Sequence, residues 1–216
     1  MEIKVLKDIL GANDQMAQSN QRLLDSNHVL AVNLMASPGA GKTSLVLETI
    51  KGLQGKVRVG VIEGDISSSV DSELIAGQGI PVVQINTGGE CHLDASMIRK
   101  ALDNLPLADI DLLLVENVGN LVCPAEFNLG EHRKVVVSSV PEGDDKPIKY
   151  PAIFLIADAV VLNKTDLLPY VKFDSGKFRE AVRGVNRKLD IFEVSCTTNQ
   201  GIDHWTSWLL AQMERG

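Results

Sequence analysis

A glycine-rich turn followed by lysine and threonine is the first stretch of this sequence that could do chemistry. It spans residues 36–44, Ala-Ser-Pro-Gly-Ala-Gly-Lys-Thr-Ser, between an apolar run and a segment with helical spacing. Small residues let backbone N–H groups surround a phosphate, and the start of a helix adds positive potential. The lysine could reach the outer phosphates, and the threonine hydroxyl could bind Mg²⁺. Ala36 replaces the first glycine of the usual pattern, so we expect backbone angles there that a Cβ tolerates. We predict a nucleotide-binding loop formed by Gly39, Ala40, Gly41, Lys42, Thr43 and Ser44.

A second motif, Asn163-Lys164-Thr165-Asp166, follows the apolar run 159–162 and indicates guanine as the base. The Asp166 carboxylate can accept hydrogen bonds from the guanine N1–H and exocyclic amine, a donor pair that adenine lacks. A buried carboxylate without donors is costly, so we expect discrimination against ATP. Asn163 and the stem of Lys164 should brace this loop and cover the base. Backbone groups at Ser195 and Cys196 should contact the guanine oxygen, which makes Cys196 a small buried residue and not a metal ligand.

Two carboxylates follow predicted strands at the edge that carries the phosphate loop. Asp65 follows the run 57–62 and Glu116 follows the run 111–115. Mg²⁺ on a nucleotide takes hard oxygen ligands, so we assign Thr43, Asp65 and Glu116 to its shell, directly or through water. Each acid could alternatively be a loop residue or a helix cap. Lys42 and Asp65 are the catalytic candidates, with Asp65 the first residue to test for positioning the attacking water.

Softer ligands form a third group. Cys91 and His92 follow one predicted strand and Cys123 follows the next, so all could meet near the nucleotide. Thiolate and imidazole suit Zn²⁺ or Ni²⁺ better than Mg²⁺. Ordinary buried thiols are the alternative. Three protein ligands leave a tetrahedron incomplete, so water or a second chain would supply the rest. His132 is a possible outside ligand, because it lies nearest to the Cys123 loop in the sequence.

Composition limits the class of protein. The chain has 216 residues, 44% of them hydrophobic, and a formal net charge of −7. The acidic balance does not suggest a nucleic-acid surface, and no apolar run is long enough to span a membrane. The first residues lack a signal-peptide core, so we expect a cytoplasmic protein. In that compartment the three cysteines favour metal binding or reactive thiols over disulfides.

Apolar runs that alternate with amphipathic segments predict an α/β fold with a mostly parallel, doubly wound sheet of about seven strands. Residues 1–27 should form a helical extension, broken near Gly11 and Asn13, and residues 28–216 a P-loop GTPase domain. The proline- and glycine-containing stretch 141–147 is typical of a loop. Strands are expected at 29–35, 57–62, 81–85, 111–115, 134–140, 159–162 and 191–194. Helices are expected at 42–53, 68–77, 94–102, 175–189 and 202–213.

Together these motifs resemble the HypB family, the nickel-incorporation GTPases of hydrogenase maturation. That family is related to the urease accessory GTPase and belongs to the dimerising, SIMIBI-class P-loop GTPases. The resemblance covers the chain from residue 29 onward, and the linked set of motifs is more specific than any one of them. The segments that carry it are 37–43, 63–65, 88–94, 116–124, 138–149 and 163–166.

The resemblance implies a metallochaperone that hydrolyses GTP to GDP and phosphate and helps load nickel into [NiFe]-hydrogenase. Its implied partners are a second copy of the chain, a nickel-binding maturation protein and the hydrogenase large-subunit precursor. Cys91, His92 and Cys123 would bind nickel or zinc at or near a GTP-favoured dimer interface. Lys146 and Lys149 would lie in a loop implicated in contacts across the dimer. The cysteine-rich nickel site that some members carry at the N-terminus is not expected, because residues 1–27 contain no cysteine.

Other functions remain open at this point. The chain could belong to the urease branch or a cobalamin-linked relative of the same class. It could be a metal-binding assembly protein whose nucleotide is only structural. It could also be a small-molecule kinase that shares the phosphate loop, although the Asn163–Asp166 motif argues against that interpretation.

Overall fold

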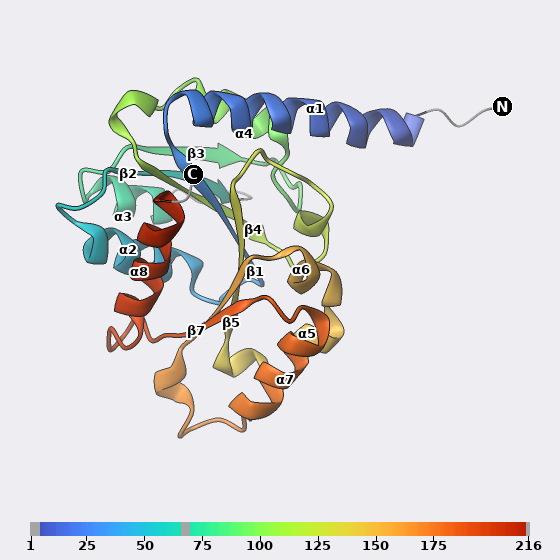
Figure 1. Cartoon of the computed structure of the whole chain (residues 1–216), viewed down its shortest axis with the longest axis vertical. Helices are drawn as coiled ribbons and strands as arrows, with labels where there is room; N and C mark the ends of the chain where they lie inside the picture. Colours follow the sequence, from blue (N-terminus) through green and yellow to red (C-terminus); the bar gives the residue numbers. More distant parts are fainter. Residues whose placement is uncertain (1–4, 66–69, 215–216) are drawn as a thin grey trace.

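A parallel sheet forms the centre of the molecule (Figure 1). The structure is a computed structural model and describes residues 5–65 and 70–214. The strand order is β3-β2-β4-β1-β5-β6-β7, and every pair of neighbours runs parallel. This confirms the predicted seven-stranded α/β fold. The strands are β1 (Leu30–Ala36), β2 (Val59–Asp65), β3 (Val82–Asn86), β4 (Leu112–Gly119), β5 (Arg133–Ser139), β6 (Ala159–Asn163) and β7 (Asp190–Glu193).

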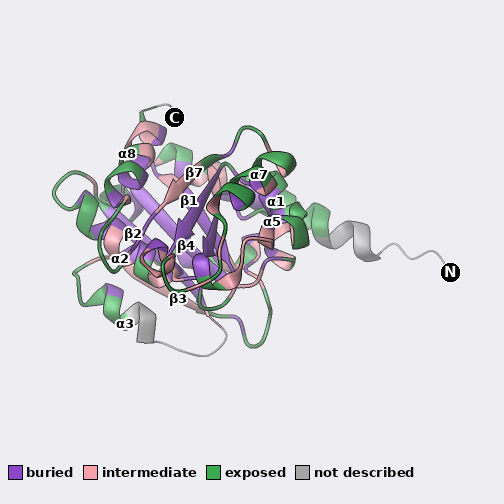
Figure 2. Cartoon of the chain, turned by 90° about the horizontal axis from the view of Figure 1, so that it is seen from below, coloured by how far each residue is buried: buried purple, intermediate pink, exposed green. Residues whose placement is uncertain are grey.

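Helices cover both faces of this sheet, as a doubly wound fold requires. Alternate residues of β1 point to opposite sides: Val32 and Leu34 pack against α2 and α8, and Ala31 and Met35 face the other layer. Figure 2 shows the buried sheet between exposed helical surfaces. The helices are α1 (Val5–Ser26), α2 (Lys42–Leu53), α3 (Val70–Ala76), α4 (Ala95–Leu102), α5 (Lys146–Lys149), α6 (Pro151–Ile156), α7 (Ser175–Val185) and α8 (Ile202–Met213).

The stretch expected to be a loop, 141–147, is partly helical, and α6 after it was not predicted. A 3-10 turn spans Val140–Glu142, and α5 and α6 follow closely. Each of these elements has proline at its first or second position. Proline fits a first helical turn because its missing N–H has no helical partner there. The prolines therefore begin short helices here.

Helix α1 runs along the outside of α4, and its N-terminal turns extend past the body of the molecule (Figure 1). The break expected near Gly11 and Asn13 is absent from the described helix, which is continuous. Of the helix predicted at 68–77, Ser68 and Ser69 lie outside the described residues, as do residues 1–4 of the predicted extension.

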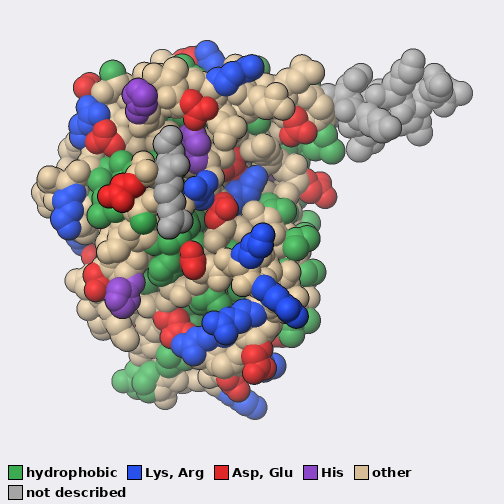
Figure 3. Space-filling model, viewed as in Figure 1, with side chains coloured by type: hydrophobic (Ala, Val, Ile, Leu, Met, Phe, Trp, Pro, Cys, Tyr) green, Lys and Arg blue, Asp and Glu red, His purple; other side chains and the backbone are tan. Residues whose placement is uncertain are grey.

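Acidic and basic side chains are intermixed over the face that Figure 3 shows. Within the described ranges, we find no helix with the length and apolar character needed to cross a bilayer.

Candidate nucleotide and metal sites

The phosphate loop lies at the carboxyl end of β1, where the strand order reverses between β4 and β5. Ligands of open α/β sheets bind at such a point. Gly39 and Gly41 have φ angles of 77° and 93°, in the left-handed region that favours glycine. Ala36 is the last residue of β1 and has no positive φ. An alanine at this position is therefore compatible with the loop.

The predicted guanine motif is fastened to the phosphate loop. The Asn163 amide donates to the Ala40 carbonyl at 3.2 Å, and Lys164 Nζ donates to the Gly39 carbonyl at 2.7 Å. A Cβ on Gly41 would lie 2.5 Å from the Asn163 amide nitrogen, so glycine is required there for space as well as for φ. The two motifs therefore form one connected unit.

The carboxylate of Asp166, which is predicted to recognise the base, is held from one side. Asp166 Oδ1 accepts a hydrogen bond from Ser195 Oγ at 2.6 Å, which orients the carboxylate. The neighbouring Cys196 N–H donates to Asn163 Oδ1 at 3.4 Å. Burial raises the pKa of the Cys196 thiol to about 11, so this half-buried side chain is a neutral thiol at physiological pH.

A cavity of about 540 Å³ opens beside the phosphate loop, lined in part by Lys42, Thr43, Asp65 and Glu116. Lys42 begins α2 and is mostly buried. Thr43 Oγ1 donates to Glu116 Oε1 at 3.0 Å, which brings two hard oxygen ligands together. Glu116 was expected after its strand but lies within β4, which continues to Gly119. Asp65 is the last residue of β2.

Sequence reasoning missed Glu63 as a member of this site. Glu63 is 2% exposed, lines the same cavity and is the register partner of Glu116 on the adjacent strand. The available signal was its spacing from Asp65, because residues two apart on a strand share a face. Carboxylates on neighbouring strands repel each other unless a cation offsets their charge. The donor set therefore fits Mg²⁺ bound with a nucleotide.

The predicted soft ligands come together. The ligand atoms of Cys91, His92 and Cys123 all lie within 4.8 Å of one another, and Cys91 Sγ donates to Cys123 Sγ at 2.9 Å. The hydrogen bond with Cys123 and, to a smaller extent, desolvation raise the pKa of the Cys91 thiol. The His92 ring stacks on Phe127 with centroids 3.8 Å apart. Thiols and imidazole at these separations fit Ni²⁺ or Zn²⁺, and the exposure of Cys91 leaves access for a further ligand.

Short contacts join the soft-ligand group, which is Cys91, His92 and Cys123, to the nucleotide cavity, which is the cavity beside the phosphate loop. A Cβ on Gly119 would lie 3.0 Å from the Pro38 backbone nitrogen, so the end of β4 lies directly against the phosphate loop. The next residue, Asn120, donates through its amide to the Cys91 carbonyl at 3.1 Å. The phosphate loop, the carboxylate-lined cavity and the two thiols therefore lie at one edge of the sheet.

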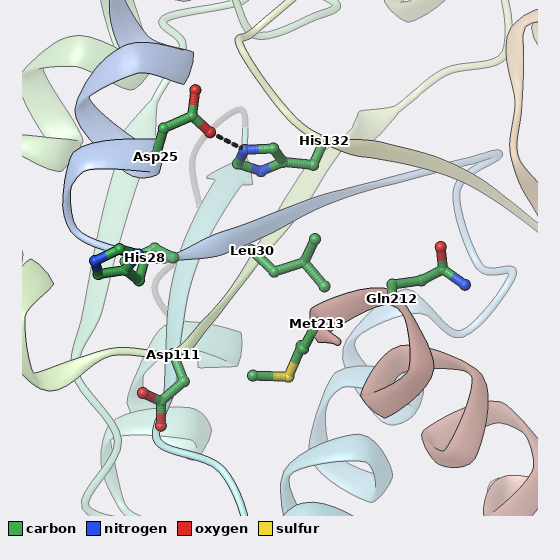
Figure 4. A pocket seen from close by; sticks show the side chains of 8 residues that line it. Asp25, His28, Leu30, Asp111, His132, Gln212 and Met213 are labelled. Carbon is green, nitrogen blue, oxygen red and sulfur yellow. Dashed lines mark hydrogen bonds and ion pairs between the residues drawn. The ribbon is translucent and has the colours of Figure 1, made fainter. Parts of the chain in front are cut away.

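His132 is not a ligand of the soft-metal group, contrary to the sequence-based suggestion. It lies at the start of β5, beside a cavity of about 460 Å³ at the opposite end of the strands (Figure 4). Its Nδ1 accepts from the Ala31 N–H at 2.9 Å, and its Nε2 lies 2.9 Å from Asp25 Oδ1. An accepting Nδ1 leaves the proton of a neutral imidazole on Nε2. Both ring nitrogens are thus engaged in joining α1 to β1.

Lys146 contacts the phosphate loop of its own chain. Its Nζ donates to Ser37 Oγ at 3.1 Å and lies 3.3 Å from a Glu142 carboxylate oxygen. Lys149 pairs with Asp145 at 2.6 Å. Both lysines belong to helix α5 and not to the loop that was expected. Lys146 thus brings a cation to the rim of the phosphate loop.

The sequence and the fold are similar to those of known proteins. Residues 30–193 match the family model for the CobW/HypB/UreG nucleotide-binding domain. A hydrogenase maturation factor HypB from Escherichia coli is 46% identical over 212 residues, covering 98% of this chain and 72% of that protein. A hydrogenase/urease maturation factor HypB from Helicobacter pylori is 37% identical and covers 97% of this chain and 87% of its own length. The crystal structure of Helicobacter pylori HypB in complex with nickel has a TM-score of 0.90 at 36% identity, covering 94% of this chain and 96% of that one.

Proposed function

Because the chain belongs to the HypB family of hydrogenase maturation factors, we propose that it is a GTPase that binds nickel and releases it for hydrogenase assembly. The observation that carries this proposal is the connection between sites: the Cys91/Cys123 pair and the phosphate loop are joined through Gly119 and Asn120. Reduced thiols persist in the cytoplasm, and we place the protein there.

The nucleotide chemistry is assigned as follows. The glycine loop holds the phosphates, Lys42 neutralises charge on the transferring phosphoryl group, and Asp166 selects guanine. Thr43, Glu116, Asp65 and Glu63 form the oxygen-rich wall that would hold Mg²⁺, which when bound offsets phosphate charge. Asp65, at the carboxyl end of β2, is the candidate that orients the attacking water. The products are GDP and phosphate.

Nickel is the cargo and not a resident cofactor. Cys91, His92 and Cys123 would bind it, with Zn²⁺ as a competitor for the same soft ligands. Three protein ligands leave an incomplete tetrahedron. We therefore propose that GTP favours a homodimer in which a second copy completes the shell. A nickel-binding maturation protein and the hydrogenase large-subunit precursor are the proposed partners before and after this step.

Coupling between nucleotide and metal is the testable core of the proposal. We expect Ni²⁺ affinity to differ between protein saturated with GDP and protein saturated with a non-hydrolysable GTP analogue, with mass recorded in the same samples. Lys42→Ala should abolish turnover, and Lys51→Ala, on the exposed face of the same helix, serves as the matched control. Equal Ni²⁺ affinity in both nucleotide states would contradict the coupling. Unchanged turnover in Lys42→Ala would favour a structural nucleotide.

A urease precursor is the alternative client. The reason to consider it is that the relative from Helicobacter pylori is named for both hydrogenase and urease maturation. Nickel transfer from the loaded protein to each purified precursor would separate the two functions.

A further inference from the structure

The inward face of α1 carries two asparagines at positions where a packed helix normally has apolar residues. Asn13, Ala17, Asn20 and Leu24 are buried, with exposures of 8%, 0%, 0% and 1%, and their spacing places them on one helical face. Asparagine disfavours a helix interior, and a buried amide is costly unless it is hydrogen-bonded. These two residues therefore need a reason that packing alone does not supply.

Both asparagines join the same two segments. Asn13 Oδ1 accepts from the Ala95 N–H at 2.9 Å, and Asn13 Nδ2 donates to the Asn128 carbonyl at 2.9 Å. Asn20 Nδ2 donates to the Ala95 carbonyl at 2.8 Å and to the Leu129 carbonyl at 3.0 Å. Each amide thus spans the gap between the segment that follows Cys91 and His92 and the segment that follows Cys123.

The helix backbone also lies directly on one of these segments. A Cβ on Gly130, whose φ is +94°, would lie 2.4 Å from the Ala17 carbonyl oxygen. Such close approach leaves α1 no room to tilt toward the segment, so the asparagine amides are fixed in position. Movement of α1 away from the body would break both bridges together.

A second set of hydrogen bonds, inside the protein, links the same two segments on the side away from α1. The Leu93 N–H donates to Asn117, Asn117 to Asn33 and Asn33 to Glu131. Glu131 in turn accepts from the Leu129 N–H at 2.8 Å. The segments that carry the soft ligands are therefore tied together on two sides, by the sheet interior and by α1.

We propose that Asn13 and Asn20 are positioning residues that hold the Cys91/His92 segment against the Cys123 segment. The proposal rests on the metal function proposed above and adds α1 to the determinants of metal affinity. Groups that orient metal ligands from outside the coordination shell change affinity by about 10–100-fold when they are removed. By linkage, metal bound between the segments stabilises the docked position of α1.

The test compares Asn13→Ala, Asn20→Ala and the double variant with two controls in or beside α1. Asn27→Ala removes an asparagine whose side-chain amide donates to Leu23 and Ser26 at the end of the same helix. Leu24→Ala matches the loss of packing without touching either bridge. Ni²⁺ affinity is measured by chelator competition and by thiolate-to-nickel absorption, beside GTP-analogue affinity and the free energy of unfolding. We expect the double variant to lose about tenfold in Ni²⁺ affinity, with nucleotide affinity retained and both controls near the parent. Asn13→Asp keeps the acceptor for Ala95 but places a carboxylate oxygen against the Asn128 carbonyl, so it should lose at least as much Ni²⁺ affinity as Asn13→Ala.

Hydrogen exchange can be measured on the parent protein, so this test does not depend on whether a variant folds. In the parent protein, Ni²⁺ should slow exchange of the Ala95 amide, whose acceptor is Asn13. A double variant that binds Ni²⁺ like the parent would overturn the inference and leave the proposed function intact. An equal loss of Ni²⁺ affinity in Leu24→Ala would also overturn it, because general loosening would then suffice. A parent protein that binds neither Ni²⁺ nor Zn²⁺ would overturn the proposed metal function itself, and this inference with it.

Discussion

Leu93 fills the space that any side chain on residue 64 would need. A Cβ at Gly64 would lie 2.8 Å from both methyl carbons of Leu93, which is fully buried. Gly64 separates Glu63 from Asp65 at the end of β2, and Leu93 directly follows His92. The strand that supplies carboxylates to the nucleotide cavity is therefore in direct contact with the segment that carries soft ligands.

Gly64→Ala should disturb both sites at once. The added methyl must displace Leu93 in a close-packed interior, at an overpacking cost of about 1–3 kcal/mol. We expect Ni²⁺ affinity to fall and its dependence on bound nucleotide to weaken, measured by titration with GDP and with a GTP analogue. Gly184→Ala, in α7 with open space around the added methyl, is the matched control and should leave both affinities unchanged. Coupling of parental size in Gly64→Ala would show that this contact does not carry it.

Asp166→Asn should change which base is bound. The amide keeps the side chain's shape but presents a donor to the guanine amine, so two charge-assisted hydrogen bonds are lost. We expect guanine-nucleotide affinity to fall about 10²–10⁴-fold, and xanthine nucleotides, which carry a carbonyl in place of that amine, to bind better than to the parent.

Competition with a fluorescent nucleotide analogue measures these affinities. Ser195→Ala should cause a smaller loss, because it removes only the hydrogen bond that orients the carboxylate. Asp203→Asn, on an exposed position of α8, controls for the charge change. Unaltered base preference in Asp166→Asn would exclude this carboxylate from base recognition.

The fold and the family could be predicted from sequence because their signals are local. Apolar runs that end at glycine, lysine or aspartate mark the strands and their functional edge, and α2 and α8 begin and end where predicted. Comparison with relatives confirms the family resemblance. The roles of the individual site residues stay predictions, although Cys91, His92 and Cys123 do lie together.

What the sequence could not supply depends on contacts between distant segments. Asn13 appeared to be a helix breaker, because its partners Ala95 and Asn128 lie far along the chain. His132 is near Cys123 in sequence but is drawn to the opposite end of the strands by Asp25 and the Ala31 N–H. The structural role of a polar side chain can be predicted only when its hydrogen-bond partners are known. The periodicity of apolar residues, in contrast, indicates a buried face from the sequence alone.

Cys196 should be chemically distinct from the other two cysteines. Its pKa is raised to about 11, first by burial and then by the nearby Glu48 carboxylate, so only a very small fraction is thiolate at neutral pH. We expect alkylation at Cys196 to be slow at pH 7 and to accelerate about tenfold per pH unit as the pH rises toward that pKa, followed by peptide mass spectrometry. Cys196→Ser should leave Ni²⁺ affinity unchanged. Rapid modification of Cys196 at pH 7, or loss of Ni²⁺ affinity in the serine variant, would contradict this assignment.

The Arg58–Asp111 pair should give the protein part of its resistance to acid. Arg58 donates to both oxygens of Asp111, through Nε at 3.0 Å and through Nη2 at 2.5 Å, and its backbone N–H adds a third hydrogen bond. The Arg58 guanidinium holds the pKa of the Asp111 carboxyl below its usual value. A carboxyl with a lowered folded-state pKa stabilises the fold above its unfolded-state pKa of about 3.9, and this contribution is lost as the pH falls through the folded-state value.

Asp111→Asn should therefore lower the free energy of unfolding by a constant amount above about pH 5, and this deficit should shrink below about pH 4. Arg58 stays charged throughout, so it adds no pH dependence of its own in this range. Urea unfolding at a series of pH values measures the difference, and Glu180→Gln, an exposed carboxyl on α7, is the control. A deficit of the same size at pH 7 and at pH 2 would mean that the aspartate stabilises the start of β4 through its shape and neutral hydrogen bonds, and not through its charge.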